Sequence, residues 1–508
     1  ERFAQDGLQP LPTQLVAGGA HQVDEILAEA QDVRGVEGRF VVARRGPGEI
    51  DLTANVERGE GRAVWRYMPH AVNAEARNWI RRGIVAGRGY DGKLILKGNL
   101  KDFPFRDGKG GKFVVTAKAT GAKVDYADGW PVIDDIDADM TFDTGMKILA
   151  SKGRILGATL ADVKVDIPDF ESHEEMLLVR GTALGPTSEF LRFIEQSPVA
   201  ETIDHFTDGM KAAGNGSLGL ELDIPLRHAL DTKMRGDYRF QNNQLQLLEG
   251  LPPLTQVYGR LQLTENTVSA QDISGQVFGG PLKVNVKNVG DRIGVVATGT
   301  AGIGEVSKHF GWPLFNHLSG RAGWKADINI RRRNAEVLIE SDLLGISSPL
   351  PDPLNKNATT PLALRIERST PDAQREQYRI TLGKVAQGLI VNRQGNWERG
   401  VLAVGDAEPR LPEKGLAVRV STPRIDADAW RAFLPEGGGA EGGGLALNVV
   451  TLKTPQLHLF DRDYNQVDVS LRPRDGGWQI GVNTREAVGD VFWKSAAEGW
   501  VEGNFKRL

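Results

Sequence analysis

The sequence predicts an all-β protein with a few short helices, built as one elongated, twisted, U-shaped antiparallel sheet with an apolar interior. Three observations lead to this prediction. Apolar and polar residues alternate along most of the chain, glycine-rich turns separate the alternating segments, and four short helical segments recur at a regular spacing. Alternation places the apolar side chains of a strand on one face and its polar side chains on the other.

The alternation is clearest at residues 259–287, "GRLQLTENTVSAQDISGQVFGGPLKVNVK". Other alternating segments lie at 93–98, 112–119, 137–143, 217–224, 325–330, 361–367, 415–421 and 465–472. At the usual strand length of about 5–6 residues plus turns, the chain has room for about 25–35 strands. Glycine supplies 61 of the 508 residues without a short period, which excludes collagen and favours many turns. Turns are expected at Asp107-Gly108, Asp128-Gly129, Gly279-Gly280-Pro281 and Asp475-Gly476-Gly477.

Four segments are expected to be helical. Asn73 is a suitable capping residue for "NAEARNWIRRGI", and Thr187 precedes a segment that Pro198 divides into two helical pieces. The segment at 303–318 is divided in the same way by Pro313, and the last helix is expected at 426–434.

These helices begin near residues 72, 188, 303 and 426, so the spacing predicts a repeat of helix, glycine turn and meandering strands. The expected organisation is one continuous elongated domain with a first β-groove segment at 1–186, repeats at 187–302 and 303–425, and the start of a fourth at 426–508. The segment "PEGGGAEGGG" at 435–444 is expected to be a linker or a long loop.

Composition narrows the classes of function. The net charge of −4 argues against a nucleic-acid partner, and the absence of cysteine excludes disulfides, thiolate metal sites and cysteine nucleophiles. No stretch approaches the 18 apolar residues of a membrane span. The chain begins with Glu1 rather than methionine, so we expect it to be a piece of a longer or processed protein.

Two segments resemble ligand-binding loops. "GRGYDGK" at 87–93 fits two phosphate-loop patterns, but a helix precedes it and a strand follows, which is the reverse of what both loops need. A helix-to-strand turn is the better interpretation. "DDIDAD" at 134–139 lacks the glycine and glutamate of a calcium loop, so its aspartates are expected on the wet face of a strand. The sequence therefore predicts no metal, no cofactor and no catalytic residues, although carboxylate pairs formed between strands stay possible.

The apolar residues of the strands can be used in two ways. Two sheets can pack face to face as a closed sandwich, or one bent sheet can leave a continuous apolar trough that binds a ligand. We expect the trough. Its predicted lining consists of alternating apolar residues: Leu94, Leu96, Phe113, Val115, Met140, Phe142, Leu218, Leu220, Leu222, Leu261, Leu263, Val284, Val286, Ile328, Ile330, Leu362, Leu364 and Ile366.

Residues 65–143 resemble the signature region of the AsmA-like family, in its large YhdP-type branch. The residues that carry this resemblance are Tyr67, Pro69, Trp79, Gly98, Phe103-Pro104-Phe105, Phe113 and Trp130-Pro131. Two further segments are similar to the family, "ISGQVFGGPLKV" at 273–284 and "ESDLLGISSPLPDPLNK" at 340–356.

The resemblance implies a periplasmic protein of Gram-negative bacteria, tethered to the inner membrane by a helix that this sequence lacks. It further implies a bridge-like lipid-transfer protein whose β-groove carries phospholipid acyl chains toward the outer membrane. The function expected from the sequence is non-enzymatic phospholipid transfer between the two membranes, with outer-membrane or other envelope proteins as further partners. The alternatives are a periplasmic scaffold or assembly factor for outer-membrane proteins, and a polysaccharide-acting β-helix enzyme, against which the long repeat argues.

Overall fold

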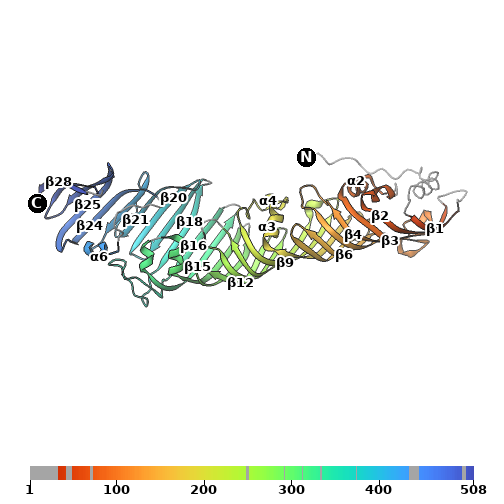
Figure 1. Ribbon diagram of the computed structural model, residues 1–508, viewed down its shortest axis with the longest axis horizontal. Helices are drawn as coiled ribbons and strands as arrows, with labels where there is room; N and C mark the ends of the chain where they lie inside the picture. The colour runs from red at the N-terminus through yellow and green to blue at the C-terminus, as the bar shows by residue number, and fades with distance from the viewer. Residues whose placement is uncertain are drawn as a thin grey trace. The chain divides into compact units, whose positions relative to one another are not determined.

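The computed structural model describes residues 33–41, 48–68, 72–247, 251–290, 292–311, 313–331, 334–372, 374–433, 445–494 and 499–508. In these ranges the strands β1 to β28 belong to one hydrogen-bonded sheet, and every helix is short (Figure 1). The prediction of an all-β fold built on one sheet with a few short helices is therefore confirmed. The glycine-rich segment at 435–444 lies outside the described residues.

The chain divides into two compact units, which we describe separately. The first comprises Glu1–Asn243 and Arg260–Thr267, and the second comprises Gln244–Gly259 and Val268–Leu508. The division into repeats at residues 187, 303 and 426 stays a prediction.

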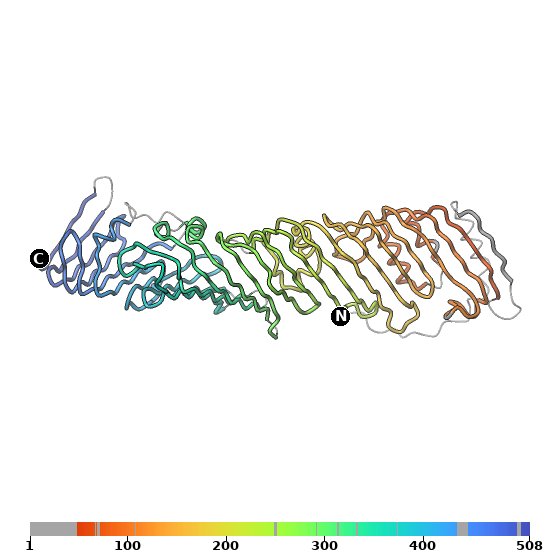
Figure 2. Tube along the Cα trace, turned by 90° about the horizontal axis from the view of Figure 1, so that it is seen from below, coloured from red at the N-terminus to blue at the C-terminus, as the bar shows by residue number. Residues whose placement is uncertain are grey.

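In the first unit, the strands β1 to β9 pair with one another in chain order, and every pair is antiparallel. Successive strands run side by side in Figure 2. β9 also pairs with β10. The bounds of these strands are β1 Val33–Val41, β2 Glu49–Glu60, β3 Ile84–Asn99, β4 Gly111–Val124, β5 Ile133–Phe142, β6 Met146–Ile155, β7 Ala158–Ile167, β8 Met176–Pro186, β9 Lys211–Pro225 and β10 Lys233–Gln246.

The larger helices of the first unit lie at one edge of its sheet. Because neighbouring strands run in opposite directions, the β2–β3 and β8–β9 connections lie on the same side of the sheet, where the strands end. We call this row of strand ends the helix edge. The opposite edge, where β3–β4, β5–β6 and β7–β8 connect, is the hairpin edge. The helix edge carries η1 (Gly61–Tyr67), α2 (Ala74–Gly83), α3 (Thr187–Glu195) and α4 (Val199–Thr202), and the hairpin edge carries η2 (Leu100–Asp102), η3 (Arg106–Gly108) and η4 (Ala229–Asp231).

The helices occur where the sequence predicts them. The Asn73 side chain caps α2 by accepting a hydrogen bond of 2.7 Å from the backbone N–H of Ala76. Pro198 separates α3 from α4, as expected for a residue that cannot continue a helix. The helix start signals were therefore strong enough to be recognised locally.

The second unit continues the same meander with one change. Its strands are the first part of β11 (Leu254–Thr264), then β12 Val268–Val277, β13 Gly280–Val289, β14 Arg292–Gly302, β15 Ser319–Arg331, β16 Asn334–Ser341, β17 Ile346–Ser347, β18 Leu364–Asp372, β19 Arg375–Leu382, β20 Ala386–Arg393, β21 Asn396–Gly405, β22 Gly415–Ser421, β23 Arg424–Asp426, β24 Leu447–Leu459, β25 Arg462–Arg474, β26 Gly477–Asn483, β27 Val488–Lys494 and β28 Trp500–Arg507. The pairs β21–β22, β22–β24 and β23–β24 are parallel, so the prediction of a wholly antiparallel sheet is wrong there.

The second unit also has a helix edge. It carries α5 (Ile303–Phe310) and η5 (Pro313–His317) between β14 and β15, and α6 (Ala427–Arg431) between β23 and β24. At its hairpin edge the β13–β14, β15–β16, β18–β19 and β20–β21 connections have two residues each.

Two predicted turns are type I′ hairpins, the turn that fits the twist of antiparallel strands. Phe278 and Gly279 join β12 to β13 with φ angles of 48° and 68°, and Asp475 and Gly476 join β25 to β26 with φ angles of 48° and 73°. The strand residues on either side of each turn pair directly.

The interpretation of "GRGYDGK" as a helix-to-strand turn is wrong, because α2 ends at Gly83 and the segment lies inside β3. Asp91, at φ 53°, marks an irregularity in that strand. The aspartates of 134–139 do lie on β5, where Asp134 pairs with Arg154 at 2.9 Å and Asp135 with Lys152 at 2.8 Å. Among the described residues no group of acidic or histidine side chains could hold a metal ion.

Candidate functional site: an apolar sheet face

The candidate site in the first unit is one face of its sheet. Residues that pair directly across neighbouring strands have their side chains on the same face. Leu94 pairs with Val115, and Val115 pairs with Phe142. The same row continues through Met146 to Ile167. Five strands thus contribute adjacent apolar side chains to this surface, which we call the apolar face.

The apolar face is uninterrupted from β4 to β9. Every position that the pairing places on it, from Gly111 on β4 to Ile224 on β9, is glycine, alanine, valine, leucine, isoleucine, methionine or phenylalanine. Leu220 is typical, since its partner on β8 is Gly181. A face of this composition can interact with hydrocarbon and offers no groups for chemistry.

The opposite face is polar and carries ion pairs between neighbouring strands. Lys97 pairs with Asp51 at 2.8 Å, and Arg180 pairs with Asp223 at 3.1 Å. The side chains in both pairs are between about two fifths and two thirds exposed, so each pair contributes little to stability. These charges keep the second face in water, and the alternation in the sequence therefore separates two chemically different surfaces.

The eighteen residues predicted to line the trough are all partly buried in the structure. Seventeen of them lie on strands, and Leu362 lies just before β18. The strands of each unit contact the strands beside them and the helices at the helix edge. Apolar residues between two packed layers are usually buried completely, so partial burial indicates a face that is open to solvent over much of its area. That these residues line a lipid path stays a prediction.

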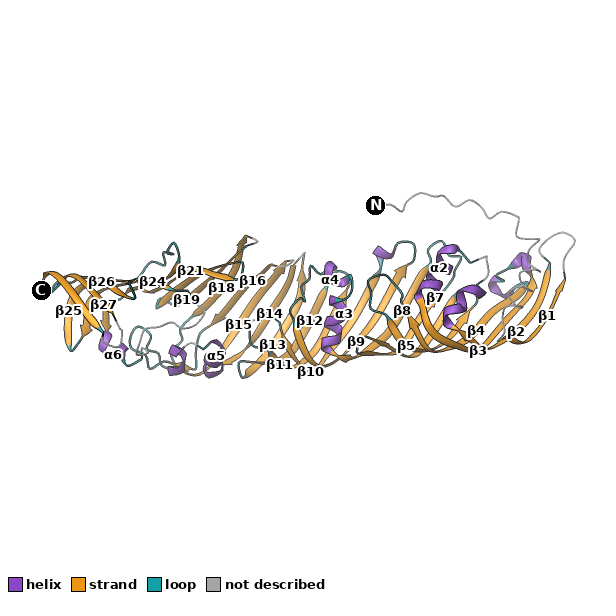
Figure 3. Cartoon of the chain, turned by 45° about the horizontal axis from the view of Figure 1, so that its top comes forward, coloured by secondary structure: helices purple, strands orange, loops and turns teal. Residues whose placement is uncertain are grey.

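Helix α3 covers one end of the apolar face in the first unit (Figure 3). Phe190 packs edge-on against Tyr238 of β10 at 5.1 Å between ring centroids, and Phe193 packs against Trp130 at 5.8 Å. The Tyr238 hydroxyl donates a hydrogen bond of 2.8 Å to Thr187, and burial raises the pKa of Tyr238 above its usual value. The helix therefore covers the face at the helix edge.

In the second unit the same pattern recurs around α5. Val286, Val295, Ile328 and Val337 pair in turn across four strands. Nearer the helix edge the side chains form a closed core of four buried residues: Val277, Leu282, Ala297 and Ala326. A surface hollow of about 340 Å³ lies beside this core, between α5 and the β12–β13 hairpin.

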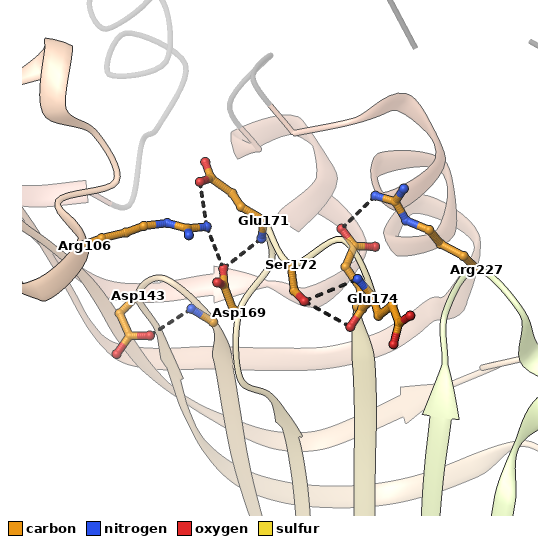
Figure 4. A network of polar contacts seen from close by, with 9 residues as sticks. Arg106, Asp143, Asp169, Glu171, Ser172, Glu174 and Arg227 are labelled. Carbon is orange, nitrogen blue, oxygen red and sulfur yellow. Dashed lines mark hydrogen bonds and ion pairs between the residues drawn. The ribbon is translucent and has the colours of Figure 1, made fainter. Parts of the chain in front are cut away.

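Ion pairs join separate connections at the hairpin edge of the first unit (Figure 4). The Arg106 guanidinium, from the β3–β4 connection, lies 3.1 Å from Asp169 and 2.8 Å from Glu171 in the β7–β8 connection. Arg227, between β9 and β10, lies 3.9 Å from Glu175. These contacts hold the loops beside the apolar face in place. The ion pairs are accessible to solvent, so they resemble structural contacts rather than a reactive centre.

Several residues that carry the family resemblance pack near the two ends of β4. The Trp79 indole N–H donates a hydrogen bond of 3.0 Å to the Tyr126 carbonyl, and Phe105 is buried. Gly98, at φ 128°, is required by close packing, because a Cβ atom there would lie 2.3 Å from the Gly110 carbonyl oxygen. Pro69 lies outside the described residues. The motif is thus structural where the structure describes it.

The fold and the site define a class of protein: a β-sheet protein that presents an extended apolar face and, among the described residues, has no metal-binding cluster. The chain belongs to the YhdP family, whose model, described as YhdP protein, matches residues 17–508. The resemblance seen in the sequence is therefore confirmed. No solved structure gives a significant match.

A curated relative is the intermembrane phospholipid transporter YhdP of Escherichia coli (strain K12). The two chains are 23% identical over 477 residues, which is 90% of this chain and 37% of the relative. The chain therefore spans little more than a third of the length of this relative. No helix within the described residues is long and apolar enough to cross a membrane.

Proposed function

We propose that this chain binds phospholipid acyl chains on its apolar face and forms part of a path for passive phospholipid transfer between the inner and outer membranes. The observation that carries the proposal is the uninterrupted, partly exposed apolar face from β4 to β9. The relative named as an intermembrane phospholipid transporter supports it. The protein acts in the periplasm without catalysis, and the full-length protein is anchored to the inner membrane.

The free energy of exposing an acyl chain and the length of the apolar face are consistent with this function. Burial of one methylene group is worth about 0.8 kcal/mol, so a sixteen-carbon chain exposed to water costs roughly 12 kcal/mol. Six strands at a spacing of about 4.8 Å extend about 24 Å, which exceeds the thickness of one leaflet of a bilayer core that is about 30 Å thick. The face can thus replace most of the apolar contacts that one acyl chain loses when it leaves a membrane.

The test introduces a charge on the apolar face. In Leu220→Asp the new carboxylate lies opposite Gly181 on the apolar face, and an unpaired charge against hydrocarbon is costly. We expect the phospholipid that copurifies with the chain from bacterial membranes to fall at least tenfold, as measured by native mass spectrometry. Leu261→Asp is expected to act in the same way.

The matched control is Ser217→Asp, which adds the same charge to β9 at a position whose side chain points to the polar face. It should leave lipid binding unchanged. Photo-crosslinkers at Leu220 and Leu261 should capture lipid, and crosslinkers at Ser217 and Gln262 should not. If the two apolar-face positions never capture lipid, the proposal fails, and a bound outer-membrane protein without lipid would favour the assembly factor instead.

A further inference from the structure

A charged cluster interrupts the apolar face of the second unit. On β18 and β19, Leu364 pairs with Leu382 and Ile366 with Ile380, but the next pair on the same face is Arg368 with Tyr378. Glu376 lies two positions from Tyr378 on β19 and therefore has the same orientation. On its other side Arg368 pairs with Val337, an apolar residue. The apolar face of the first unit, by contrast, has no charged side chain from β4 to β9.

The cluster is held together by charge-assisted hydrogen bonds. One terminal nitrogen of the Arg368 guanidinium donates to a Glu376 oxygen, and the other donates to the Ala335 carbonyl at 2.7 Å. The Tyr378 hydroxyl donates to the second Glu376 oxygen at 2.7 Å. Burial alone would raise the pKa of Glu376, but the bonds from Arg368 and Tyr378 lower it below its usual value. Both charges of the pair are therefore present at neutral pH.

A buried or half-buried ion pair is seldom the most stabilising choice for an apolar setting, since apolar residues of similar size are often as good or better. The side chains of Arg368 and Glu376 are 24% and 34% exposed, so a ligand on the apolar face can reach them. Their position is therefore better explained by recognition of a polar group than by stability.

One polar atom beside the cluster lacks a partner. Among the described residues, the buried Thr370 Oγ1 atom has no hydrogen-bond partner. Thr370 follows Arg368 by two positions on β18. Buried polar atoms are normally satisfied, so this hydroxyl is available to a ligand bound beside Arg368.

We propose that Arg368, Thr370, Glu376 and Tyr378 form a binding site for the phosphate of a glycerophospholipid headgroup, whose acyl chains lie on the adjoining apolar face. The inference rests on the proposed function and deepens it. The remaining N–H groups of Arg368 and the Thr370 hydroxyl donate to the phosphate oxygens, a geometry to which guanidinium groups are suited. Glu376 and Tyr378 hold Arg368 in place.

The test compares two lipids with the same tails. The full chain is loaded with dioleoyl phosphatidylglycerol or with dioleoylglycerol, which lacks the phosphate, and occupancy is measured by native mass spectrometry. The wild-type chain should prefer the phospholipid. In the double variant Arg368→Met/Glu376→Gln, which removes both charges together, that preference should fall about tenfold, while dioleoylglycerol binds as before.

The matched control is Arg365→Met/Glu340→Gln, which removes an ion pair of 2.7 Å from the polar face of the same strand and should change neither lipid. Thr370→Val is a second variant that keeps the fold, because it removes a hydroxyl without a partner, and it should also reduce the preference. If the wild-type chain and the variants bind both lipids equally, the headgroup site is wrong and the proposed function stands. If the wild-type chain binds neither lipid, the proposed function itself fails.

Inorganic phosphate distinguishes a headgroup from a free anion. We expect it, added in excess to the lipid-free chain, to bind weakly and not to displace the phospholipid. Tight binding of inorganic phosphate that is lost in Arg368→Met/Glu376→Gln would overturn the assignment to a lipid. Unchanged lipid preference in a double variant that melts at a lower temperature would show that the cluster serves the fold alone.

Discussion

Asn243 is completely buried at the end of the apolar face in the first unit. Its amide nitrogen donates hydrogen bonds to the Thr187 hydroxyl and to the Ala213 carbonyl, and its oxygen accepts a bond of 2.7 Å from the Gln241 backbone N–H. The side chain therefore connects β9, β10 and the first residue of α3. This single residue fixes the helix that closes the face at the helix edge.

Asn243→Ala should destabilise the first unit by about 2–3 kcal/mol, because it leaves buried hydrogen-bonding groups without partners. For a unit of this size, that corresponds to a fall in melting temperature of about 5–10 °C. Thermal unfolding followed by circular dichroism measures the change. Asn215→Ala, at an exposed position of β9, is the control and should melt like the wild-type chain. An unchanged melting temperature for Asn243→Ala would show that the network is dispensable.

Residue-level contacts of this kind are beyond prediction from the sequence. Asn242 and Asn243 lie in a polar segment that alternation alone would place in water, yet Asn243 is buried. Lys356 is similar, since its ammonium group donates to the carbonyls of Leu343, Ile346 and Asn357 inside a loop. Arg368 and Glu376 are eight residues apart and look like ordinary strand charges. Only the pairing between strands reveals their neighbours.

At the scale of elements, the β12–β13 hairpin and the neighbouring helix α5 each contain a glycine. Glycine is favourable in the turn and unfavourable in the helix. Gly279 has a φ of 68° in the turn, and a Cβ atom there would lie 3.1 Å from Glu305 Cγ. Gly304 lies within α5, and a Cβ atom there would meet nothing within 4 Å. The first position needs glycine, whereas the second does not.

Gly279→Ala should therefore destabilise the second unit by about 1–2 kcal/mol, the cost of a left-handed conformation for a residue with a Cβ atom. Gly304→Ala should stabilise it by about 0.5–1 kcal/mol, because alanine loses less entropy in a helix. Equilibrium unfolding in urea gives both values. If both variants changed the free energy of unfolding in the same direction, the assignment of the turn and the helix would be contradicted.

The sequence was most informative about individual helices and turns. Asn73, Pro198 and the Asp475-Gly476 turn act through local backbone geometry, so the helix starts and hairpins they predict are present. The parallel pairing of β21 with β22 could not be foreseen, because a strand has the same alternation whichever direction its neighbour runs. The phosphate-loop pattern at 87–93 was correctly discounted, but its place inside β3 depends on the strand irregularity at Asp91.

At the scale of the whole molecule, both units present an apolar face, so a ligand that binds these faces should stabilise both. A ligand present at a hundred times its Kd adds about 2.7 kcal/mol to the free energy of unfolding. We expect bound phosphatidylethanolamine to raise the melting temperature of the chain in scanning calorimetry. The gain should be lost in part in Leu220→Asp and in part in Ile328→Asp, which alter different units.

Since the two substitutions lie in different units, their effects should add in the double variant. Thr298→Asp is a suitable control, because Thr298 pairs with Lys283 on the polar face of the second unit. Complete loss of lipid stabilisation from either single substitution would mean that the units do not bind lipid independently. The apolar alternation predicts such a surface from the sequence, but which helices cover its ends is decided by contacts between distant residues.

The two edges of the second unit differ in a way that bears on how a lipid is exchanged. Its helices all lie at one edge, and the turns between β13 and β21 at the other edge are as short as hairpins allow. A hydrocarbon tail can therefore approach this edge without meeting a helix of the described residues. We therefore expect a bound lipid to load and unload at any point along this edge of the second unit, rather than only at one end of its sheet.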